Sequence, residues 1–492
     1  MTPDSTPSGL PRQGTPDAAA RTAVVVGGGL AGITAALRLA DAGLRVTLVE
    51  GRPRLGGLAF SFRREGAAGE LTVDNGQHVY LRCCAAYRWF LDRVEGSRLA
   101  PLQDRLDVPV LDAGTGGAPR LGRLRRTALP VPLHLAGGLA RYPHLSPAER
   151  VGVARAALAL KGLDPADPAL DGTDFASWLR RHGQSERAVE ALWDLVGVAT
   201  LNARAADVSL GLAAMVFRTG LLSRPGAADI GWARVPLGTL HDTLARAALD
   251  AAGVRTVLQG RVRSVTPAPD GGWQLGLRRG GEPERRLGAD AVVLAVPQDE
   301  TAALLPEGAL DDPGRLRAIG TSPILNVHVV YDRPVLRRPF FAALGTPVQW
   351  VFDRTDASGL TGGGQYLALS QSAAHDEIDT PAGTLRERYL PELARLLPAA
   401  RSAQVRDFFV TRERTATFAP APGVGRLRPA ARTRAPGLYL AGAWTDTGWP
   451  ATMEGAVRSG ITAARAALSE QGRPHLDPPP AFRRGNPQQE AA

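Results

Sequence analysis

TAVVVGGGLAGI, residues 22–33, is the stretch that decides the fold of this chain. Its β-branched run up to Val26 predicts a strand buried on both faces, and the apolar residues after Gly32 recur at helical spacing. Gly27, Gly29 and Gly32 have the spacing G-x-G-x-x-G. The first glycine allows a tight turn, the second lets a pyrophosphate approach the backbone, and the third lets helix and strand pack closely. The stretch therefore predicts a dinucleotide site at a helix N-terminus.

An acidic residue follows at the distance that such a site needs. A second apolar strand is expected from Leu44 to Val49, and Glu50 ends it, 18 residues after Gly32. A carboxylate at this place can accept hydrogen bonds from both hydroxyls of an adenosine ribose. A glycine-rich turn that binds nothing is the alternative, but the strand, the helix and the acid together favour dinucleotide binding.

A second glycine pair, Gly56-Gly57, follows Glu50 closely, and a nicotinamide site does not require one. Here the sequence resembles the superfamily of flavin-dependent amine oxidases and phytoene (carotenoid) desaturases. The resemblance implies an FAD cofactor whose pyrophosphate and ribityl chain pass this pair. Many members have arginine after the pair, where this chain has Leu58. That phosphate contact is therefore expected from Arg52 or Arg54, or it is missing.

The motif that begins at Gly437 and continues as LYLAGAWTDTGWPATMEGAV matches the other end of the superfamily pattern. It predicts a strand, a loop past the flavin and a helix after Pro450 whose N-terminus faces the reduced ring. Ordinary strand–turn–helix packing is the alternative. The superfamily usually has aspartate at the position of Ala443, so FAD binding is expected to be weaker here unless Asp446 compensates.

The resemblance also implies which residues contact FAD, including Val262, whose backbone is expected at the adenine. It implies no metal. The expected contacts are Gly27, Gly29, Leu30, Ala31, Gly32, Glu50, Gly51, Arg52, Arg54, Gly56, Gly57, Leu58, Val262, Gly442, Ala443, Thr452 and Met453.

A segment of four polar side chains, Asp74-Asn75-Gly76-Gln77-His78, precedes an apolar helix that starts with Cys83-Cys84. This string resembles the hydroxysqualene dehydroxylases within the superfamily. The resemblance implies reductive removal of the hydroxyl of hydroxysqualene to give squalene, a precursor of hopanoids. A buried polar turn with all its hydrogen bonds satisfied is the alternative. The two cysteines are expected to be buried as small apolar residues rather than to form a redox pair.

Such a reaction needs an acid near the hydroxyl, and four residues are candidates for it: Asp446, Glu454, His78 and Asp74. Asp446 is preferred because it lies in the loop expected to face the flavin, whereas Glu454 is suited to capping a helix. Two other functions stay open. One is a carotenoid desaturase of the phytoene type, and the other is a non-catalytic isoprenoid-binding protein on the same fold.

The predicted fold class is α/β, a Rossmann-like FAD-binding domain of the amine oxidase (GR2) type with an inserted substrate domain of helices and mixed sheet. We expect tails at 1–20 and 471–492, FAD-binding segments at 21–97, 236–299 and 421–470, a helical substrate- or membrane-facing region at 98–235 and a substrate-domain sheet at 300–420.

Local patterns refine the two inserted regions. A capping box opens a helix at Ser146-Pro147-Ala148-Glu149. The almost uncharged segment 208–222 predicts either an ordinary helical core or an apolar lining for substrate or lipid. Alternation around Asn326 and His328 predicts a strand with one wet and one buried face.

The 492 residues carry a net charge of +10, and Lys161 is the only lysine. Such a basic balance suits nucleic acid, an acidic lipid surface or an acidic partner, or it reflects a genome rich in G and C. No dense basic cluster is interleaved with aromatic residues, so nucleic acid is disfavoured. We expect a cytoplasmic protein, peripheral on the inner face of the bacterial membrane, that meets a long isoprenoid substrate and the enzymes that precede it.

Overall fold

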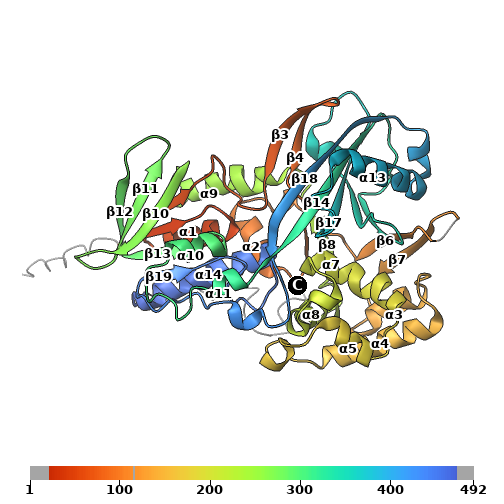
Figure 1. Ribbon diagram of the computed structural model, residues 1–492, viewed down its shortest axis with the longest axis horizontal. Helices are drawn as coiled ribbons and strands as arrows, with labels where there is room; N and C mark the ends of the chain where they lie inside the picture. Colours follow the sequence, from red (N-terminus) through yellow and green to blue (C-terminus); the bar gives the residue numbers. More distant parts are fainter. Residues whose placement is uncertain (1–20, 115–116, 474–492) are drawn as a thin grey trace, which may run out of the picture.

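A computed structural model describes residues 21–114 and 117–473 of the chain (Figure 1). The expected tails at 1–20 and beyond Arg473 lie outside the described residues.

The dinucleotide unit at the start of the chain forms the centre of a parallel five-stranded sheet with the order β19-β13-β1-β2-β9. Three separate segments of the chain supply its strands, which are β1 (Thr22–Val26), β2 (Arg45–Glu50), β9 (Arg255–Leu258), β13 (Ala291–Leu294) and β19 (Leu438–Leu440). Because β1, β13 and β19 are covered on both faces, their side chains are almost all apolar and buried, whereas no residue of the edge strand β9 is fully buried.

One face of this sheet packs against three helices, α1 (Leu30–Asp41), α9 (Ala245–Ala251) and α14 (Met453–Glu470), in one apolar core. The other face packs against an antiparallel sheet of three strands, β10 (Gly260–Pro267), β11 (Trp273–Arg279) and β12 (Arg285–Ala289). Figure 1 places this small sheet at one end of the molecule. The α/β fold class predicted from the glycine motif is therefore confirmed.

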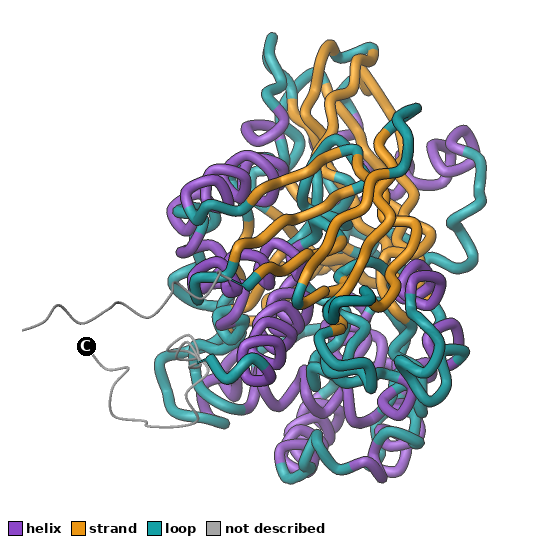
Figure 2. The backbone as a smooth tube through the Cα atoms, turned by 90° about the vertical axis from the view of Figure 1, so that its left-hand side faces the viewer, coloured by secondary structure: helices purple, strands orange, loops and turns teal. Residues whose placement is uncertain are grey.

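A seven-stranded mixed sheet forms the second layer structure, with the order β18-β14-β17-β16-β15-β6-β7 (Figure 2). Its strands are β6 (Asp107–Asp112), β7 (Arg120–Arg125), β14 (Thr321–Tyr331), β15 (Phe340–Leu344), β16 (Trp350–Asp353), β17 (Gln365–Ser372) and β18 (Val405–Phe418). Strands β6 and β7 lie in the region predicted to be mostly helical. They differ from the prediction because β6 pairs with β15, more than 200 residues away.

The prediction of one wet face for β14 is wrong. Asn326 and His328 are completely buried. The apolar face of β14 shares a core with helix α13 (Ala382–Leu396). The segment around Asn75 covers the other face of β14, which carries Asn326 and His328. The alternation predicted the polar face correctly, but protein segments cover it, and protein groups bind the Asn326 amide nitrogen and both His328 nitrogens.

The helical region contains α3 (Leu133–Ala140), α4 (Pro147–Lys161), α5 (Phe175–Arg181), α6 (Glu186–Ala188), α7 (Leu195–Leu201) and α8 (Leu210–Phe217), with π-helical turns η3 (Val189–Asp194) and η5 (Arg218–Leu222). The capping box at Ser146 is present: its hydroxyl accepts from the Glu149 amide, and the Glu149 carboxylate accepts from the Ser146 amide. Helix α8 is buried in the core, so segment 208–222 matches the core alternative rather than a lipid-facing surface.

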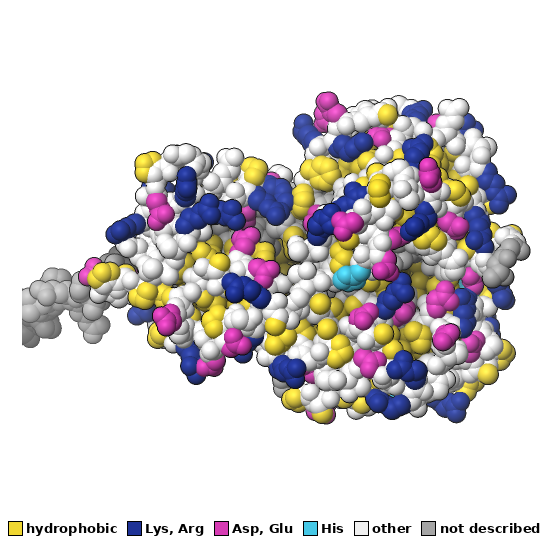
Figure 3. Space-filling view, viewed as in Figure 1, with side chains coloured by type: hydrophobic (Ala, Val, Ile, Leu, Met, Phe, Trp, Pro, Cys, Tyr) yellow, Lys and Arg dark blue, Asp and Glu magenta, His cyan; other side chains and the backbone are white. Residues whose placement is uncertain are grey.

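Shorter elements connect these layers. They are β3 (Ser61–Gly66), β4 (Gly69–Asp74), β5 (Val79–Leu81), β8 (Ile230–Trp232), α2 (Ala85–Arg93), α10 (Gln298–Leu304), α11 (Arg315–Ala318), α12 (Thr355–Ser358), the π-helical η6 (Thr239–Leu244) and the 3-10 turns η1 (Ser97–Leu99), η2 (Pro168–Leu170), η4 (Ala205–Asp207), η7 (Pro398–Arg401) and η8 (Gly425–Leu427). The surface is hollowed between the β10–β12 sheet and the β3–β4 hairpin (Figure 3). Among the described helices, none combines the length and apolarity that crossing a bilayer requires.

Candidate functional site

The two glycine turns lie against each other at the carboxyl ends of the parallel strands. The Gly56 amide donates to the Gly28 carbonyl at 2.9 Å, and a Cβ on Gly57 would stand 2.9 Å from the Gly29 Cα. Gly57 has a φ of +58°, which side chains disfavour, so this close approach requires glycine on steric and conformational grounds. The turns therefore present bare backbone to whatever lies above them.

Helix α1 begins at this place with Gly29 as its N-cap, and no side chain caps it. Its first amide groups consequently lack the usual side-chain acceptor and suit the oxygens of a phosphate. Leu30, Ala31 and Gly32 supply this first turn, as expected for the cofactor contacts.

Glu50 ends β2 beside the first turn and is only partly buried. Its carboxylate accepts from the Gly28 amide at 2.6 Å and from the Arg52 amide at 2.7 Å. Each carboxylate oxygen has a further lone pair, so both can still accept from ribose hydroxyls. The position and remaining acceptor capacity of Glu50 fit the predicted contact.

Of the two arginines expected near the phosphates, Arg54 lies on the second glycine turn. Its guanidinium donates to the carbonyls of Leu55 and Gly57 and stacks on the ring of Phe60 at 3.3 Å. Burial, together with the nearby Arg52, lowers the Arg54 pKa to about 10. Arg52 is exposed beside Glu50, and Gly51 is exposed between them.

The loop after β19 is held by Arg428, a residue that the sequence analysis missed. Its buried guanidinium donates to the carbonyls of Ala443, Thr445 and Trp449. Desolvation lowers the pKa of Arg428 to about 10. One arginine therefore fixes the whole loop that the motif places beside the flavin.

Two further contacts anchor the ends of this loop. The Gly442 amide donates to the buried Ser459 hydroxyl on α14. Thr452 is the N-cap of α14, since its hydroxyl accepts from the Gly455 amide, and Met453 is the first helical residue.

At the other end of the expected site, Val262 is buried in β10 and pairs with Leu277.

Asp74 is buried and fully engaged with protein groups. Its carboxylate accepts from the Ser61 hydroxyl, the Leu237 amide and the Arg354 guanidinium, at 2.6, 2.9 and 2.7 Å. Arg354 also donates to the Ala233 carbonyl. These contacts join β4 to two other segments, and they favour a structural role for Asp74. Its role as an acid stays a prediction.

Asn75 connects the polar turn to the second glycine turn. Its amide nitrogen donates to the Leu58 carbonyl at 2.9 Å and to Glu413 Oε1 at 3.0 Å, and its side-chain oxygen accepts from the Phe60 amide. Leu58 is exposed directly after the glycine pair. The Glu413 carboxylate, which the sequence analysis did not name, is therefore held beside the second glycine turn.

Two buried polar atoms near Asn75 lack partners among the described residues, Gln77 Nε2 and Asn326 Oδ1. The Asn326 amide nitrogen donates to the Asn75 carbonyl, and the Thr411 hydroxyl donates to the same oxygen. A hydroxyl both donates and accepts, so it could satisfy either this unpaired donor or this unpaired acceptor.

His78 follows in the same turn, with its Nδ1 at 3.0 Å from the Gly76 carbonyl. Burial lowers its pKa. The imidazole is therefore neutral at pH 7, so it is a poor proton donor, and its role as an acid stays a prediction.

Glu454 is 1% exposed, and its carboxylate accepts from the amides of Ala86 and Tyr87 and from the Arg458 guanidinium. Glu454 caps α2, because the side chain of the N-cap residue Cys84 makes no capping hydrogen bond. Burial raises its pKa. The geometry favours a structural role, although the cap belongs to a neighbouring helix rather than to its own.

Asp446, the preferred candidate, is exposed in the loop that Arg428 holds, and its amide donates to the Pro429 carbonyl. Cys83 and Cys84 are free and buried, as expected. A hydrogen bond with Cys83 and burial raise the pKa of Cys84, so this thiol is poorly suited to redox exchange.

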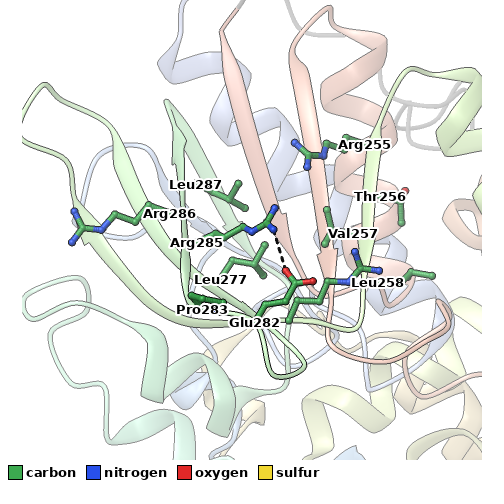
Figure 4. A pocket seen from close by; sticks show the side chains of 11 residues that line it. Arg255, Thr256, Val257, Leu258, Leu277, Glu282, Pro283, Arg285, Arg286 and Leu287 are labelled. Atoms are coloured by element: carbon green, nitrogen blue, oxygen red, sulfur yellow. Dashed lines mark ion pairs between the residues drawn. The ribbon is translucent and has the colours of Figure 1, made fainter.

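A pocket of about 330 Å³ lies between β9 and the β10–β12 sheet (Figure 4). Apolar side chains line it together with four arginines, Arg255, Arg279, Arg285 and Arg286, and Arg285 forms an ion pair with Glu282. None of the predicted catalytic or cofactor-binding residues lines this pocket.

Comparison with known proteins identifies the group to which this architecture belongs. Residues 30–468 match the family model of flavin-containing amine oxidoreductases. The chain belongs to this family. Its cofactor is FAD, and the uncapped α1 N-terminus, the free acceptor capacity of Glu50 and the bare glycine turns fit that cofactor.

Within the flavin-containing family, two relatives are hydroxysqualene dehydroxylases. The protein from Rhodopseudomonas palustris is 32% identical over 91% of this chain and 99% of its own length, and that from Sinorhizobium fredii is 30% identical over 91% and 98%. A 15-cis-phytoene desaturase from Narcissus pseudonarcissus is 26% identical over 91% of this chain and 79% of its own length.

A solved structure of the same architecture is the cyclohexylamine oxidase from Brevibacterium oxydans. It has a TM-score of 0.67 and 19% identity, and the match covers 92% of this chain and all of that one. At this identity the likeness concerns the fold, which agrees with the parallel sheet and the mixed sheet described above.

Proposed function

We propose that this flavoenzyme removes the hydroxyl group of hydroxysqualene reductively and releases squalene and water. The observation that carries the proposal is the match to hydroxysqualene dehydroxylases, which extends over 91% of the chain and nearly the whole of each relative.

The bond broken is the allylic C–O bond, and the bond formed is C–H at the same carbon. Reduced FAD supplies the hydride. The protein supplies the proton, so that the hydroxyl leaves as water and the delocalised carbocation persists until hydride reaches it. The site must also exclude bulk water, which would restore the alcohol.

We propose Glu413 as the proton donor and keep Asp446 as the alternative. Asn75 holds Glu413 beside Leu58 and the glycine turns, whereas Asp446 is exposed. A substrate hydroxyl would supply the hydrogen-bond partner that the unpaired Asn326 Oδ1 or Gln77 Nε2 lacks.

The chain's own residues also account for retention of the cofactor. The first turn of α1 and Arg54 would bind the phosphates of FAD, and Glu50 would bind the ribose. The Val262 backbone would contact the adenine, and the loop held by Arg428 would contact the flavin ring. Ala443 removes a ribityl contact that relatives with aspartate make, so we expect FAD affinity to rest mainly on the remaining set.

Desaturation of a carotenoid precursor is the second candidate function, since a phytoene desaturase also matches most of the chain, at lower identity. An escort that only binds isoprenoids is the third. Because the substrate is an oil, we place the enzyme at the cytoplasmic surface of the membrane, next to the enzymes that make its substrate.

The decisive experiment is anaerobic. The purified holoenzyme is photoreduced, hydroxysqualene is added, and squalene is measured together with reoxidation of the flavin. One squalene for each flavin reoxidised is expected. Reoxidised enzyme incubated in parallel with phytoene should give no desaturated product. Flavin that stays reduced with hydroxysqualene, or desaturation of phytoene, would contradict the proposal.

A further inference from the structure

Exposed large apolar side chains are concentrated in one part of the molecule. Seven are exposed among the described residues, and five of them lie between residues 121 and 158. They are Leu121 on β7, Leu129 and Leu133 at the start of α3, and Val151 and Leu158 on α4. Scattered exposed leucines need no explanation, but a concentration of this kind marks an interaction surface.

Helix α4 has two apolar faces. Val153, Ala156 and Leu160 are buried in the core of the helical region. Val151 and Leu158, seven residues apart and hence on one face, are more than half exposed, at 57% and 54%. An ordinary surface helix has polar residues on its outer face, so this second apolar face is unexplained by folding.

Helix α3 continues the same surface, because it packs against both β7 and α4. Of its residues only His134 is fully buried. Leu129 and Leu133 are 51% and 54% exposed around a proline-containing turn. Figure 1 shows α3 and α4 at the end of the molecule opposite the β10–β12 sheet.

The exposed charges of β7, α3 and α4 that lack an ionic partner among the described residues are cationic. Arg125, Arg141, Arg155 and Lys161 are exposed and form no ion pair within the described part of the chain. The single acid between residues 121 and 161 is Glu149, whose carboxylate is occupied by the Ser146 amide and the Ser185 hydroxyl. The next acids, Asp164 and Asp167, lie beyond the end of α4, where each accepts from a local amide.

We propose that β7, α3 and α4 form a docking surface for an anionic lipid bilayer. The five apolar side chains would enter the interfacial layer, and the four cations would lie at the lipid phosphates. Docking would give the enzyme access to an oily substrate dissolved in the membrane, and this role rests on the proposed function. The binding of the surface to a bilayer does not depend on that function.

A second copy of the chain is a poorer occupant of this surface. A twofold interface brings the same patch of both subunits together, so the four unpaired cations of one copy would face those of the other. A bilayer that contains anionic lipids supplies the opposite charge and the apolar phase together.

Vesicle binding tests the surface without turnover. We expect the FAD-loaded enzyme to bind vesicles of phosphatidylglycerol and phosphatidylcholine. The triple variant Leu129→Ser/Leu133→Ser/Leu158→Ser should bind at least about tenfold more weakly. Arg155→Gln/Lys161→Gln should lose about tenfold on the anionic vesicles.

The matched control removes the same charge at the other end of the molecule. Arg255→Gln/Arg286→Gln should bind the vesicles as the unmodified enzyme does. An equal loss in this control would mean that binding follows net charge, and it would overturn the proposed surface.

A site-specific label gives an independent measurement, because Cys83 and Cys84 are buried. Leu158→Cys and Arg286→Cys are each labelled with an environment-sensitive dye. Vesicles should shift the emission to the blue only at position 158. An unchanged spectrum there would overturn the proposal, and so would a blue shift without vesicles that grows with protein concentration, which would identify a second copy as the occupant.

The triple variant should turn over detergent-dispersed hydroxysqualene at the unmodified rate. Vesicle binding without any such turnover would refute the proposed function alone, and turnover without vesicle binding would refute the docking surface alone.

Discussion

Two carboxylates near the cofactor loops differ in what surrounds them. Asp446 is exposed on the loop that Arg428 holds, while Glu413 reaches the second glycine turn through Asn75. A proton donor must be shielded from bulk water, and Glu413 is the less exposed of the two carboxylates. This difference supports the proposal of Glu413 as the donor.

We expect Glu413→Gln to lower turnover of hydroxysqualene by about 10²–10⁴-fold, the usual contribution of a general acid, because the amide cannot donate an acidic proton. The yellow flavin spectrum should persist. Asp446→Asn should keep most of the activity. Single-turnover kinetics of the reduced enzyme measure both, and the reverse result would assign the acid to Asp446.

His241 is buried and neutral, with Nδ1 beside the Ala59 carbonyl and Nε2 beside the Tyr87 hydroxyl. Burial lowers its pKa from 6.5 to about 4. The unfolded chain therefore binds a proton at His241 below about pH 6.5, whereas the folded chain binds it only near pH 4 and below. Stability should fall as the pH drops through this window, by about 3 kcal/mol for this residue.

Replacing His241 by Gln should flatten that part of the pH dependence. Urea unfolding followed by circular dichroism between pH 4.5 and 7.5 measures it, at the cost of a lower overall stability in the variant. His78 and His328, whose pKa values burial also lowers, remain in both proteins and contribute to the residual slope. An unchanged slope would show that His241 is not the titrating group.

At the scale of elements, the glycine turns and the loop held by Arg428 come from opposite ends of the chain. The second glycine turn is supported by its contact with the first, and the loop after β19 is supported by Arg428. Their positions relative to one another depend on β1, β13 and β19 being neighbours in one sheet.

Gly57→Ala should lower FAD affinity strongly while the fold survives, since its Cβ would press on Gly29 and separate the turns. Gly253→Ala is the matched control, because it also has a positive φ but open space around it. Both variants place a side chain at a positive φ, which should cost about 1–2 kcal/mol of stability. Flavin content after purification should fall only for Gly57→Ala, and equal flavin content in both would contradict the role of the contact between the turns.

Arg428→Met should release the loop and leave several carbonyls without donors. We expect a loss of stability of about 1–3 kcal/mol or more and weaker retention of FAD. Arg426→Met, in the adjacent turn η8, is the control for the loss of a charge. Flavin fluorescence after dilution measures dissociation, and a dissociation rate equal to that of the control would refute the positioning role.

At the scale of the whole molecule, one apolar core includes strands of the FAD sheet, the β10–β12 sheet and the helical region. Three distant segments of the chain also build the FAD sheet itself. The domains are therefore continuous in space although interrupted in sequence, and they should unfold together.

FAD should consequently stabilise the entire chain. At a free concentration 100 times its Kd, the gain is about 2.7 kcal/mol. Differential scanning calorimetry of the apoprotein and holoprotein should show one transition that moves to higher temperature as a unit. Two transitions, of which only one responds to FAD, would show that the helical region unfolds independently.

Local signals were predictable wherever a backbone conformation needs a particular residue type. The glycine turns, the strands beside them and the Ser146 capping box are of this kind, and the structure confirms them. Segment 208–222 left two alternatives open because buried and lipid-facing helices are equally apolar.

Long-range contacts were not predictable. Glu413 lies 338 residues from its partner Asn75, and Arg428 contacts a loop whose carbonyls carry no sequence signal. Strands β6 and β7 were not predicted because β6, with which β7 pairs, joins the sheet through the remote strand β15. Asn326 and His328 were expected to face solvent, because a sequence shows which residues are polar but not which segments pack over that face of the strand.

The sequence by itself determined the dinucleotide fold, because glycine spacing and an acid at a strand end follow from local backbone geometry. The family and FAD followed from the resemblance of the second glycine pair and the closing motif to a known superfamily. Only the tertiary structure decided that Glu454 caps α2, that Asp74 joins segments, and that Glu413 reaches the glycine turn. The physical reason is that a carboxylate's role depends on which donors and charges surround it, and folding brings those from hundreds of residues away.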